Sequence, residues 1–278
     1  MSSTVVEHRP ILLLDHLEAM APRIASAETI ALFLDFDGTI SPIVPTPADA
    51  ALDPKIGAIL KALVARADFG VSIVSGRALA DLRERIALPD VIYVGNHGLE
   101  IEANATCFRE PRAESLRREL RSLVLQLKLA LSETDGLEIE DKGLTVSVHF
   151  RRVNEHLHDW VRSITFSTVA RSRSFSCREG KMVLEVKPQI EWHKGYAVCW
   201  IMREIAPYGA LPVYIGDDVT DEDAFGSIPE GITIRVGGSG DSRAQYLLPD
   251  VQAVGQFLQW LDLSKPHASF ANSQRAGR

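Results

Sequence analysis

Short apolar runs that end in a polar turn recur towards both ends of this chain of 278 residues. They occupy residues 29–34, 71–74, 91–94, 213–215 and 232–236. Stretches with helical periodicity separate them, at residues 54–66, 78–85, 195–205 and 251–261. Continuous apolar runs are typical of strands that are buried on both faces, and their alternation with helices predicts a Rossmann-like α/β fold with a doubly wound parallel sheet.

The central part of the chain has a different pattern and predicts a second domain. Residues 144–151 alternate strictly between apolar and polar side chains, which is typical of an antiparallel strand with one exposed face. We also expect helices at residues 113–131 and 155–169 and a strand at 182–187. The sequence therefore predicts an α+β insertion at residues 102–187, acting as a lid, on a core domain formed by residues 1–101 and 188–278.

The overall charge excludes several kinds of partner. The formal net charge is −7 and the isoelectric point is about 5.6. Because surfaces rich in phosphate attract basic proteins, we expect neither nucleic-acid binding nor membrane binding. No apolar run approaches the ~20 residues that span a bilayer, and the first residues lack a basic leader with a cleavage site.

The cysteines and the chain ends complete this picture. Cys107, Cys177 and Cys199 have neither close pairing nor zinc-type spacing, so we expect no disulfide framework and no metal cluster from them. A reducing, cytoplasmic location is the simplest interpretation. The first ten residues and residues 264–278 show no periodicity, and we expect both stretches to be disordered.

Two carboxylates follow the first apolar run. Asp35 and Asp37 lie two residues apart in the segment Asp-Phe-Asp-Gly-Thr, so both side chains point to the same side of an extended chain end. One of them can attack phosphorus while the other handles a proton. Repulsion between a carboxylate and a phosphate calls for a cation, and hard oxygen ligands suit Mg²⁺. The alternative is that the two aspartates only cap a turn.

A second acidic cluster, residues 216–223, follows a later apolar run. Val219 and Glu222 interrupt the alternation of oxygen ligands that a calcium-binding EF-hand loop requires. We therefore expect a metal site shared with the first cluster, in which Asp217 is a direct ligand and Asp218 or Asp221 supports it. The alternative is an ordinary solvated acidic loop.

Two further short segments of the sequence offer phosphate ligands. Ser75, Gly76 and Arg77 follow the second apolar run and offer a hydroxyl and backbone N–H groups at the start of a helix, where an anion is stabilised. Lys194 opens a later helix and can neutralise phosphate charge. A plain helix cap and an exposed lysine are the alternatives.

These observations single out four segments, those around Asp35, Ser75, Lys194 and Asp217. In their chain order they resemble the motifs of the haloacid dehalogenase superfamily of phosphotransferases. The resemblance implies that Asp35 is the nucleophile and Asp37 the general acid and base. It also implies that Ser75, Gly76 and Lys194 bind phosphate. The implied Mg²⁺ ligands are Asp35, Asp37 through its backbone carbonyl, Asp217 and Asp218.

A narrower resemblance covers residues 30–261 and points to the trehalose-6-phosphate phosphatase family. It rests on the stretches 74–77, 95–98, 140–142, 149–151, 184–188 and 216–225. The resemblance implies a sugar site that contains Arg77, Asn96, His97, Gly98, Glu140, Lys142 and Glu185. From the residues alone, Asp141-Lys142-Gly143 predicts a hairpin tip, and the lid charges are as consistent with an exposed strand as with a sugar site.

These expectations combine into one function, hydrolysis of trehalose 6-phosphate through an aspartyl-phosphate. The partner is then a small-molecule sugar phosphate, and the resemblance implies functional coupling to a trehalose-6-phosphate synthase. Two alternatives stay open. One is a phosphatase for another sugar phosphate, such as sucrose 6-phosphate or a mannosyl phosphate. The other is a sugar-phosphate sensor without catalysis, against which the intact pair of Asp35 and Asp37 argues.

Overall fold

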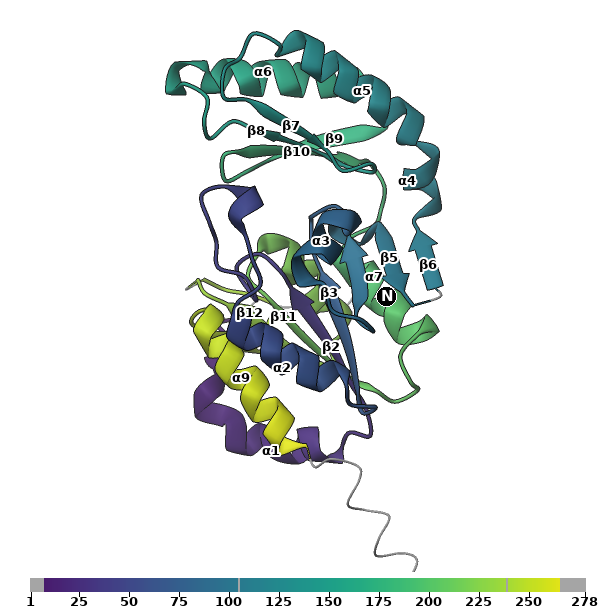
Figure 1. Cartoon of the computed structure of the whole chain (residues 1–278), viewed down its shortest axis with the longest axis vertical. Helices are drawn as coiled ribbons and strands as arrows, with labels where there is room; N and C mark the ends of the chain where they lie inside the picture. The colour runs from purple at the N-terminus through teal and green to yellow at the C-terminus, as the bar shows by residue number, and fades with distance from the viewer. Residues whose placement is uncertain (1–7, 105, 239, 266–278) are drawn as a thin grey trace, which may run out of the picture. The chain divides into compact units, whose positions relative to one another are not determined.

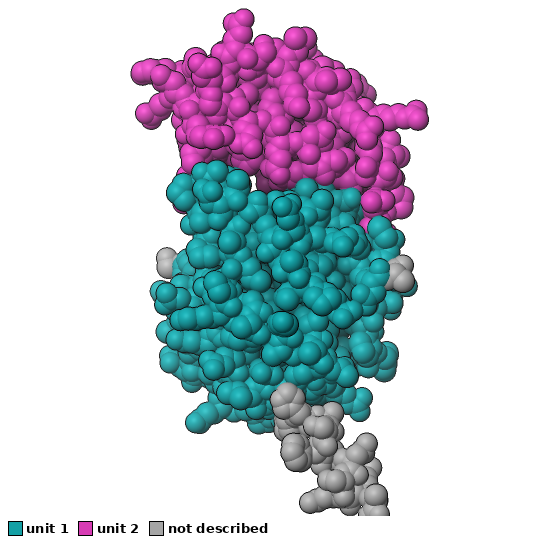
Figure 2. Space-filling model, viewed as in Figure 1, with its two compact units in different colours: residues 1–107, 192–278 teal, residues 108–191 magenta. Residues whose placement is uncertain are grey.

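A computed structural model describes residues 8–104, 106–238 and 240–265. The chain forms two compact units, one of residues 1–107 with 192–278 and one of residues 108–191 (Figure 2). The expected boundaries of the insertion were 102 and 187. Among the described residues, no helix is both long enough and apolar enough to cross a bilayer.

The first unit is built on one large sheet, although the second half of its last strand, β6, belongs to the second unit. The strands of this sheet follow the order β1-β13-β12-β11-β2-β3-β4-β5-β6. They span Ile11–Leu12 (β1), Ile30–Asp35 (β2), Phe69–Val74 (β3), Ile92–Gly95 (β4), Glu100–Ala103 (β5), Thr106–Arg109 (β6), Leu211–Gly216 (β11), Ile232–Val236 (β12) and Tyr246–Leu248 (β13). Neighbours from β1 to β4 in this order pair in parallel, and β4 and β5 are antiparallel. The predicted doubly wound parallel sheet is confirmed.

Helices complete this unit. They are α1 (Leu17–Ser26), α2 (Pro54–Val64), α3 (Leu79–Ile86), α7 (Lys194–Glu204), α8 (Glu222–Ser227) and α9 (Val251–Ser264), with short 3₁₀ turns η1 (Leu13–His16), η2 (Pro47–Asp49), η3 (Asn96–Gly98) and η5 (Val219–Asp221). Figure 1 shows α1, α2 and α9 packed beside one another, and their apolar side chains share one core with β2, β3 and β11.

The central position of β2 explains how the chain delivers its first aspartate. All six residues of β2 are buried, in a strand flanked by β3 and β11. Since parallel strands present their carboxyl ends at one edge of the sheet, the residues that follow β2, β3 and β11 come close together. Those residues belong to the predicted site segments around Asp35, Ser75 and Asp217.

The second unit is an α+β domain, as predicted. Its four-stranded sheet has the order β7-β8-β10-β9, with every pair antiparallel. The strands are Glu138–Asp141 (β7), Val146–His149 (β8), Phe175–Gly180 (β9) and Val183–Pro188 (β10), and the helical segments are α4 (Pro111–Ser115), α5 (Arg117–Ala130), η4 (Glu155–Leu157) and α6 (His158–Val169). Apolar residues of α5, α6 and the sheet form a core of their own.

Several details differ from the sequence predictions. The helix expected at residues 113–131 is interrupted at Leu116, where ψ is −2° and the N–H is shared among carbonyls of the preceding turn. The polar face of the strand expected at 144–151 is only partly exposed, because Thr145 and Ser147 are buried and His149 half-buried, while Arg151 is exposed. The expected disorder of the two ends falls mostly outside the described residues, although Ser264 closes α9 and His8 forms a bridge to Ser242.

Candidate active site

Asp35 is the last residue of β2 and lies against a buried lysine. The Asp35 side chain is buried, and its Oδ1 accepts a hydrogen bond of 2.7 Å from Lys194 Nζ. Lys194 is the first residue of α7, a helix whose N-cap is His193, which accepts from Gly195 N–H. The two residues lie 159 positions apart in the chain, so only the fold brings this pair together.

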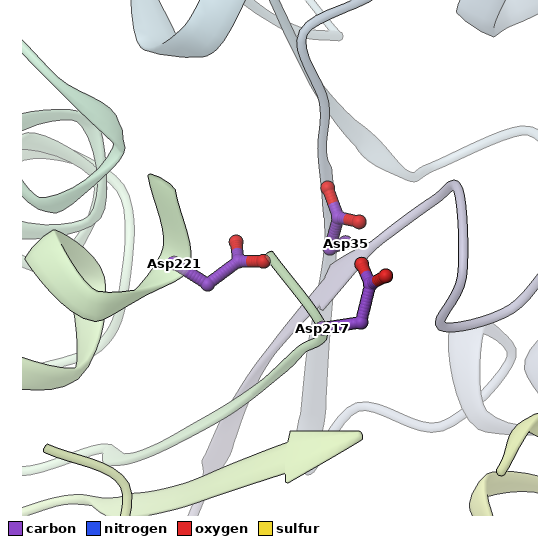
Figure 3. A group of neighbouring side chains, drawn as sticks. All are labelled: Asp35, Asp217 and Asp221. Atoms are coloured by element: carbon purple, nitrogen blue, oxygen red, sulfur yellow. The ribbon is translucent and has the colours of Figure 1, made fainter. Parts of the chain in front are cut away.

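Two more carboxylates converge on Asp35. Oxygen atoms of Asp35, Asp217 and Asp221 all lie within 4.8 Å of one another. Figure 3 shows the three side chains pointing inward from the end of β2, the loop after β11, and η5. Gly38 makes room for this group, because a Cβ at that position would lie 2.1 Å from Asp217 Oδ2.

Asp221 is the most deeply buried member and is held by several donors. Its Oδ1 accepts hydrogen bonds of 2.7 Å from both Lys194 Nζ and the Tyr214 hydroxyl. Its Oδ2 accepts from the backbone N–H of Asp218 at 2.9 Å. Since these donors occupy its oxygens, Asp221 orients Lys194, and a cation is more accessible to Asp35 and Asp217.

The electrostatics of the group are unfavourable without a cation. Burial raises the pKa of Asp35 well above its ordinary value, with Asp221 and Asp217 adding to the effect and Lys194 opposing it. Burial and the charge of Asp221 raise the pKa of Asp217 to about 7. The two neighbouring carboxylates keep the pKa of Lys194 well above its ordinary value despite its burial, so it is charged.

The group fits a divalent cation. Among the described residues, Asp217 Oδ1 is buried and has no hydrogen-bond partner. Three carboxylates face the single ammonium group of Lys194. Carboxylate oxygens are the ligands that Mg²⁺ prefers, and a cation here would relieve both the repulsion and the unpartnered oxygen.

Asp37 has a different environment from Asp35. Its carboxylate is partly exposed and pairs with Arg77 through two hydrogen bonds of 2.7 Å. Arg77 also binds Asp81 at 2.9 Å. The pairs with Asp37 and Asp81 raise the pKa of Arg77 although burial works against its charge.

The turn after β3 lies at the same edge of the sheet. Ser75 is buried, and its backbone N–H donates to Val94 of β4. Its hydroxyl accepts from the N–H of Arg77 at 3.2 Å. Gly76 passes close to the ring of His97, since a Cβ there would lie 2.4 Å from the imidazole Cε1.

The Asn-His-Gly turn forms η3 after β4. Asn96 and His97 have φ values of 51° and 58°, in the left-handed region. The buried Asn96 side chain donates to Glu100 at 2.7 Å, and Gly98 O accepts from the Trp192 indole at 2.8 Å. These contacts hold the turn in one conformation.

The charged residues that the sequence analysis named in the insertion share one face of the second unit's sheet. Glu140, Ser147 and Glu185 are paired in one row across β7, β8 and β10. Lys142 lies at the predicted hairpin tip, two residues from Glu140, with its Nζ 3.8 Å from the Glu140 carboxylate. Glu140 also pairs with His149 at 3.0 Å.

Three residues differ in role from what the sequence emphasised. Asp218 is exposed and acts in a capping box at the start of η5, outside the carboxylate group. Sequence reasoning missed Tyr214, which lies within an apolar run and carries no separate polar signal. Asp221 was kept only as an alternative to Asp218.

The fold and these sites define a class of protein, the haloacid dehalogenase-like hydrolases. A hydrolase of this type from Bacteroides thetaiotaomicron has the same fold, with a TM-score of 0.59 and 13% identity over 83% of this chain and 98% of that one. The trehalose-phosphatase family model matches residues 33–246, and the chain belongs to this family.

Individual relatives agree with this assignment. A trehalose-phosphate phosphatase of Mycobacterium tuberculosis is 34% identical over 238 residues, which cover 82% of this chain and 60% of the relative. The chain matches only 19% of a longer Mycobacterium tuberculosis protein, at 35% identity. The crystal structure of a trehalose-6-phosphate phosphatase related protein has a TM-score of 0.73 and 25% identity over 84% of this chain and 97% of that one.

Proposed function

We propose that this protein hydrolyses trehalose 6-phosphate to trehalose and phosphate in a Mg²⁺-dependent reaction. The observation that carries the chemistry is the buried Asp35 carboxylate, 2.7 Å from the charged Lys194 and grouped with Asp217. A binding protein without catalysis has no need for a nucleophile of this kind beside a second, partly exposed carboxylate, Asp37. Membership of the trehalose-phosphatase family supports the choice of substrate.

The reaction proceeds in two steps. In the first, Asp35 attacks phosphorus and forms an aspartyl-phosphate, while Asp37 gives its proton to the departing sugar oxygen. In the second, Asp37 takes a proton from water, which attacks phosphorus and releases Asp35 and phosphate. Lys194, with Ser75 and the N–H of Gly76, binds the phosphoryl oxygens and stabilises their charge.

Asp35, Asp217 and the carbonyl of Asp37 would hold the Mg²⁺ ion. Asp218, which we also named as a ligand, is exposed and caps η5, so we assign it no more than a supporting part. When bound, the ion neutralises the phosphate and the carboxylates so that attack by an anion becomes possible.

We further propose that the α+β unit is a lid that recognises the sugar. Glu140 and Glu185, aligned across the sheet, accept hydrogen bonds from sugar hydroxyls, and Lys142 donates one. The Asn96-His97-Gly98 turn assists from the first unit. A cytoplasmic location belongs to the same proposal and is supported by three cysteines that are all free thiols. So does coupling to a trehalose-6-phosphate synthase, which would supply the substrate.

The test is phosphate release from trehalose 6-phosphate, sucrose 6-phosphate, glucose 6-phosphate and mannose 6-phosphate, with and without Mg²⁺. We expect a strong preference for trehalose 6-phosphate that chelation abolishes. Metal-dependent activity spread over the other sugars would keep the chemistry and reject the proposed sugar specificity. Inactivity on all four, with binding retained, would favour a sensor.

A further inference from the structure

We propose that Arg77 is a positioning residue for proton transfer, holding the Asp37 carboxylate in place rather than binding the sugar itself. This inference rests on the proposed phosphatase activity. It replaces the role in sugar binding that the sequence resemblance implies for Arg77. Three features of the first unit support it: the geometry of the pair, the anchoring of Arg77, and the acceptor sites that remain on Asp37.

The pair between the two residues is bidentate. Arg77 Nε donates to Asp37 Oδ2 and Arg77 Nη2 donates to Asp37 Oδ1, each at 2.7 Å. Two parallel hydrogen bonds from a rigid, planar guanidinium fix both the position and the plane of a carboxylate. A single hydrogen bond, or a lysine, would leave the carboxylate free to rotate.

Arg77 is itself anchored. Its side chain is only 11% exposed. Nη1 donates to Asp81 at 2.9 Å, and Nη2 also donates to the Pro47 carbonyl at 2.9 Å. The guanidinium lies over the ring of Phe36, 5.3 Å from its centroid. A guanidinium has five N–H groups, and these contacts with Asp37, Asp81 and Pro47 use four of them, so little capacity remains for a sugar.

The pair uses only part of the acceptor capacity of Asp37. An ionised carboxylate offers about four lone-pair sites, and Arg77 occupies two of them. The Asp37 side chain is 44% exposed, so the remaining sites are open to a leaving oxygen or to water. Asp37 lies in the turn after β2, outside the strand itself. Displacement of a catalytic group by ~1 Å can reduce the rate about 100-fold.

A double-mutant cycle with Arg77→Gln and Asp37→Asn tests the inference, with kcat and KM measured on trehalose 6-phosphate. We expect Arg77→Gln to lower kcat about 100-fold while KM changes less than about 3-fold. In the Asp37→Asn background, Arg77→Gln should have no further effect, because the residue through which it acts is already lost. Arg77→Lys should restore only part of kcat.

Two control variants on α3, the helix that follows Arg77, separate positioning from general structure. Arg83→Gln removes an exposed pair with Glu102 and should leave kcat unchanged. Arg85→Gln removes a partner of Asp81, and also contacts with the Ala48 and Ala50 carbonyls, without touching Asp37. It should lower the melting temperature more than kcat. If Arg77→Gln does not fold, the cycle is run with Arg77→Lys.

Each contrary outcome identifies what is wrong. A rise in KM with unchanged kcat in Arg77→Gln would assign Arg77 to the sugar and overturn the inference. A loss of the same size in the Asp37→Asn background would also overturn it, since Arg77 would then act independently. A wild-type enzyme active only on another sugar phosphate overturns the proposed substrate, yet the cycle is still decisive on that substrate. A wild-type protein without any phosphatase activity overturns both proposals.

Discussion

The Tyr214 hydroxyl donates a 2.7 Å hydrogen bond to Asp221 Oδ1, the oxygen that also accepts from Lys194. All three side chains are buried. Burial and the charge of Asp221 raise the pKa of Tyr214 well above its ordinary value, so the hydroxyl stays protonated and donates. Tyr214 on β11 therefore holds Asp221 in place, and Asp221 orients the Lys194 side chain beside Asp35.

Replacing Tyr214 by phenylalanine should weaken both stability and activity. The change removes a hydrogen bond to a buried charged group, which costs about 1.5–3 kcal/mol of unfolding free energy. Lys194 loses part of its support, so we expect kcat to fall about tenfold with little change in KM. Denaturant unfolding and phosphate release measure the two effects. Tyr208→Phe, at a fully exposed tyrosine, is the matched control and should change neither. An unaltered kcat in Tyr214→Phe would show that Lys194 needs no such support.

Mg²⁺ should stabilise the folded protein, and this effect should depend on Asp217. A ligand that binds only the folded state adds about 2.7 kcal/mol at 100 times its Kd. Without the ion, Asp217 is a carboxylate with a pKa of about 7 in a repulsive group. We therefore expect Asp217→Asn to keep or raise the melting temperature in chelator and to lose the increase caused by Mg²⁺.

Asp218→Asn provides the comparison within the same loop. Its exposed side chain lies outside the carboxylate group, so the Mg²⁺-dependent rise in melting temperature should largely persist. Equal losses in the two variants would restore Asp218 as a ligand. Thermal melts with and without Mg²⁺ at pH 8 measure both responses.

The sequence was most informative where chemistry and periodicity coincide. The apolar run before Asp35 identifies a buried strand, and the polar residues that close it belong to the edge where parallel strands end. The same argument located Ser75 and Asp217 correctly at that edge. Because β2, β3 and β11 are neighbours in the sheet, the segments that follow them come together independently of the loop conformations.

Other features depend on geometry that no local pattern encodes. Arg77 and Asp37 are 40 residues apart, and their pairing follows from how the turn after β2 meets the start of α3. The choice between Asp218 and Asp221 depends on the conformation of η5, where Asp221 turns inward and Asp218 caps the turn. Tyr214 has the same apolar neighbours as any core residue, so its polar role was not predictable.

Gly76 should tolerate no side chain. A Cβ there would lie 2.4 Å from the His97 ring, and relief requires His97 or the turn after β3 to move. We expect Gly76→Ala to cost about 1–3 kcal/mol of unfolding free energy. It should also reduce kcat/KM, because the displaced residues belong to the proposed phosphate and sugar sites. Gly70→Ala on β3 is the control, because no atom of the described residues other than the adjacent ones lies within 4 Å of a Cβ there, and it should be neutral or slightly stabilising. Equal stabilities of the two variants would contradict the steric argument.

Asp68 should stabilise the first unit in a pH-dependent way. It accepts hydrogen bonds from Arg66, which also binds the carboxylate and carbonyl of Asp262 and the carbonyl of Lys265, linking the end of α2 to the end of α9. Burial opposes ionisation of Asp68, but Arg66 outweighs it and holds the pKa of Asp68 below its ordinary value. We expect Asp68→Asn to lower the unfolding free energy at pH 7 by about 2 kcal/mol.

The sign of the pH dependence follows from that lowered pKa. The folded state binds fewer protons at Asp68 than the unfolded state, whose pKa is about 3.9, so the contribution is complete above that pH. It disappears as the pH falls through the lower, folded pKa. Urea unfolding between pH 7 and pH 3 should therefore show the wild type and Asp68→Asn converging in stability at acid pH. Asp159→Asn, in a pair whose aspartate is almost fully exposed, should lose little stability at any pH. If the unfolding free energies of wild type and Asp68→Asn differed by the same amount down to pH 3, the effect of the substitution would come from packing and not from the charge of Asp68.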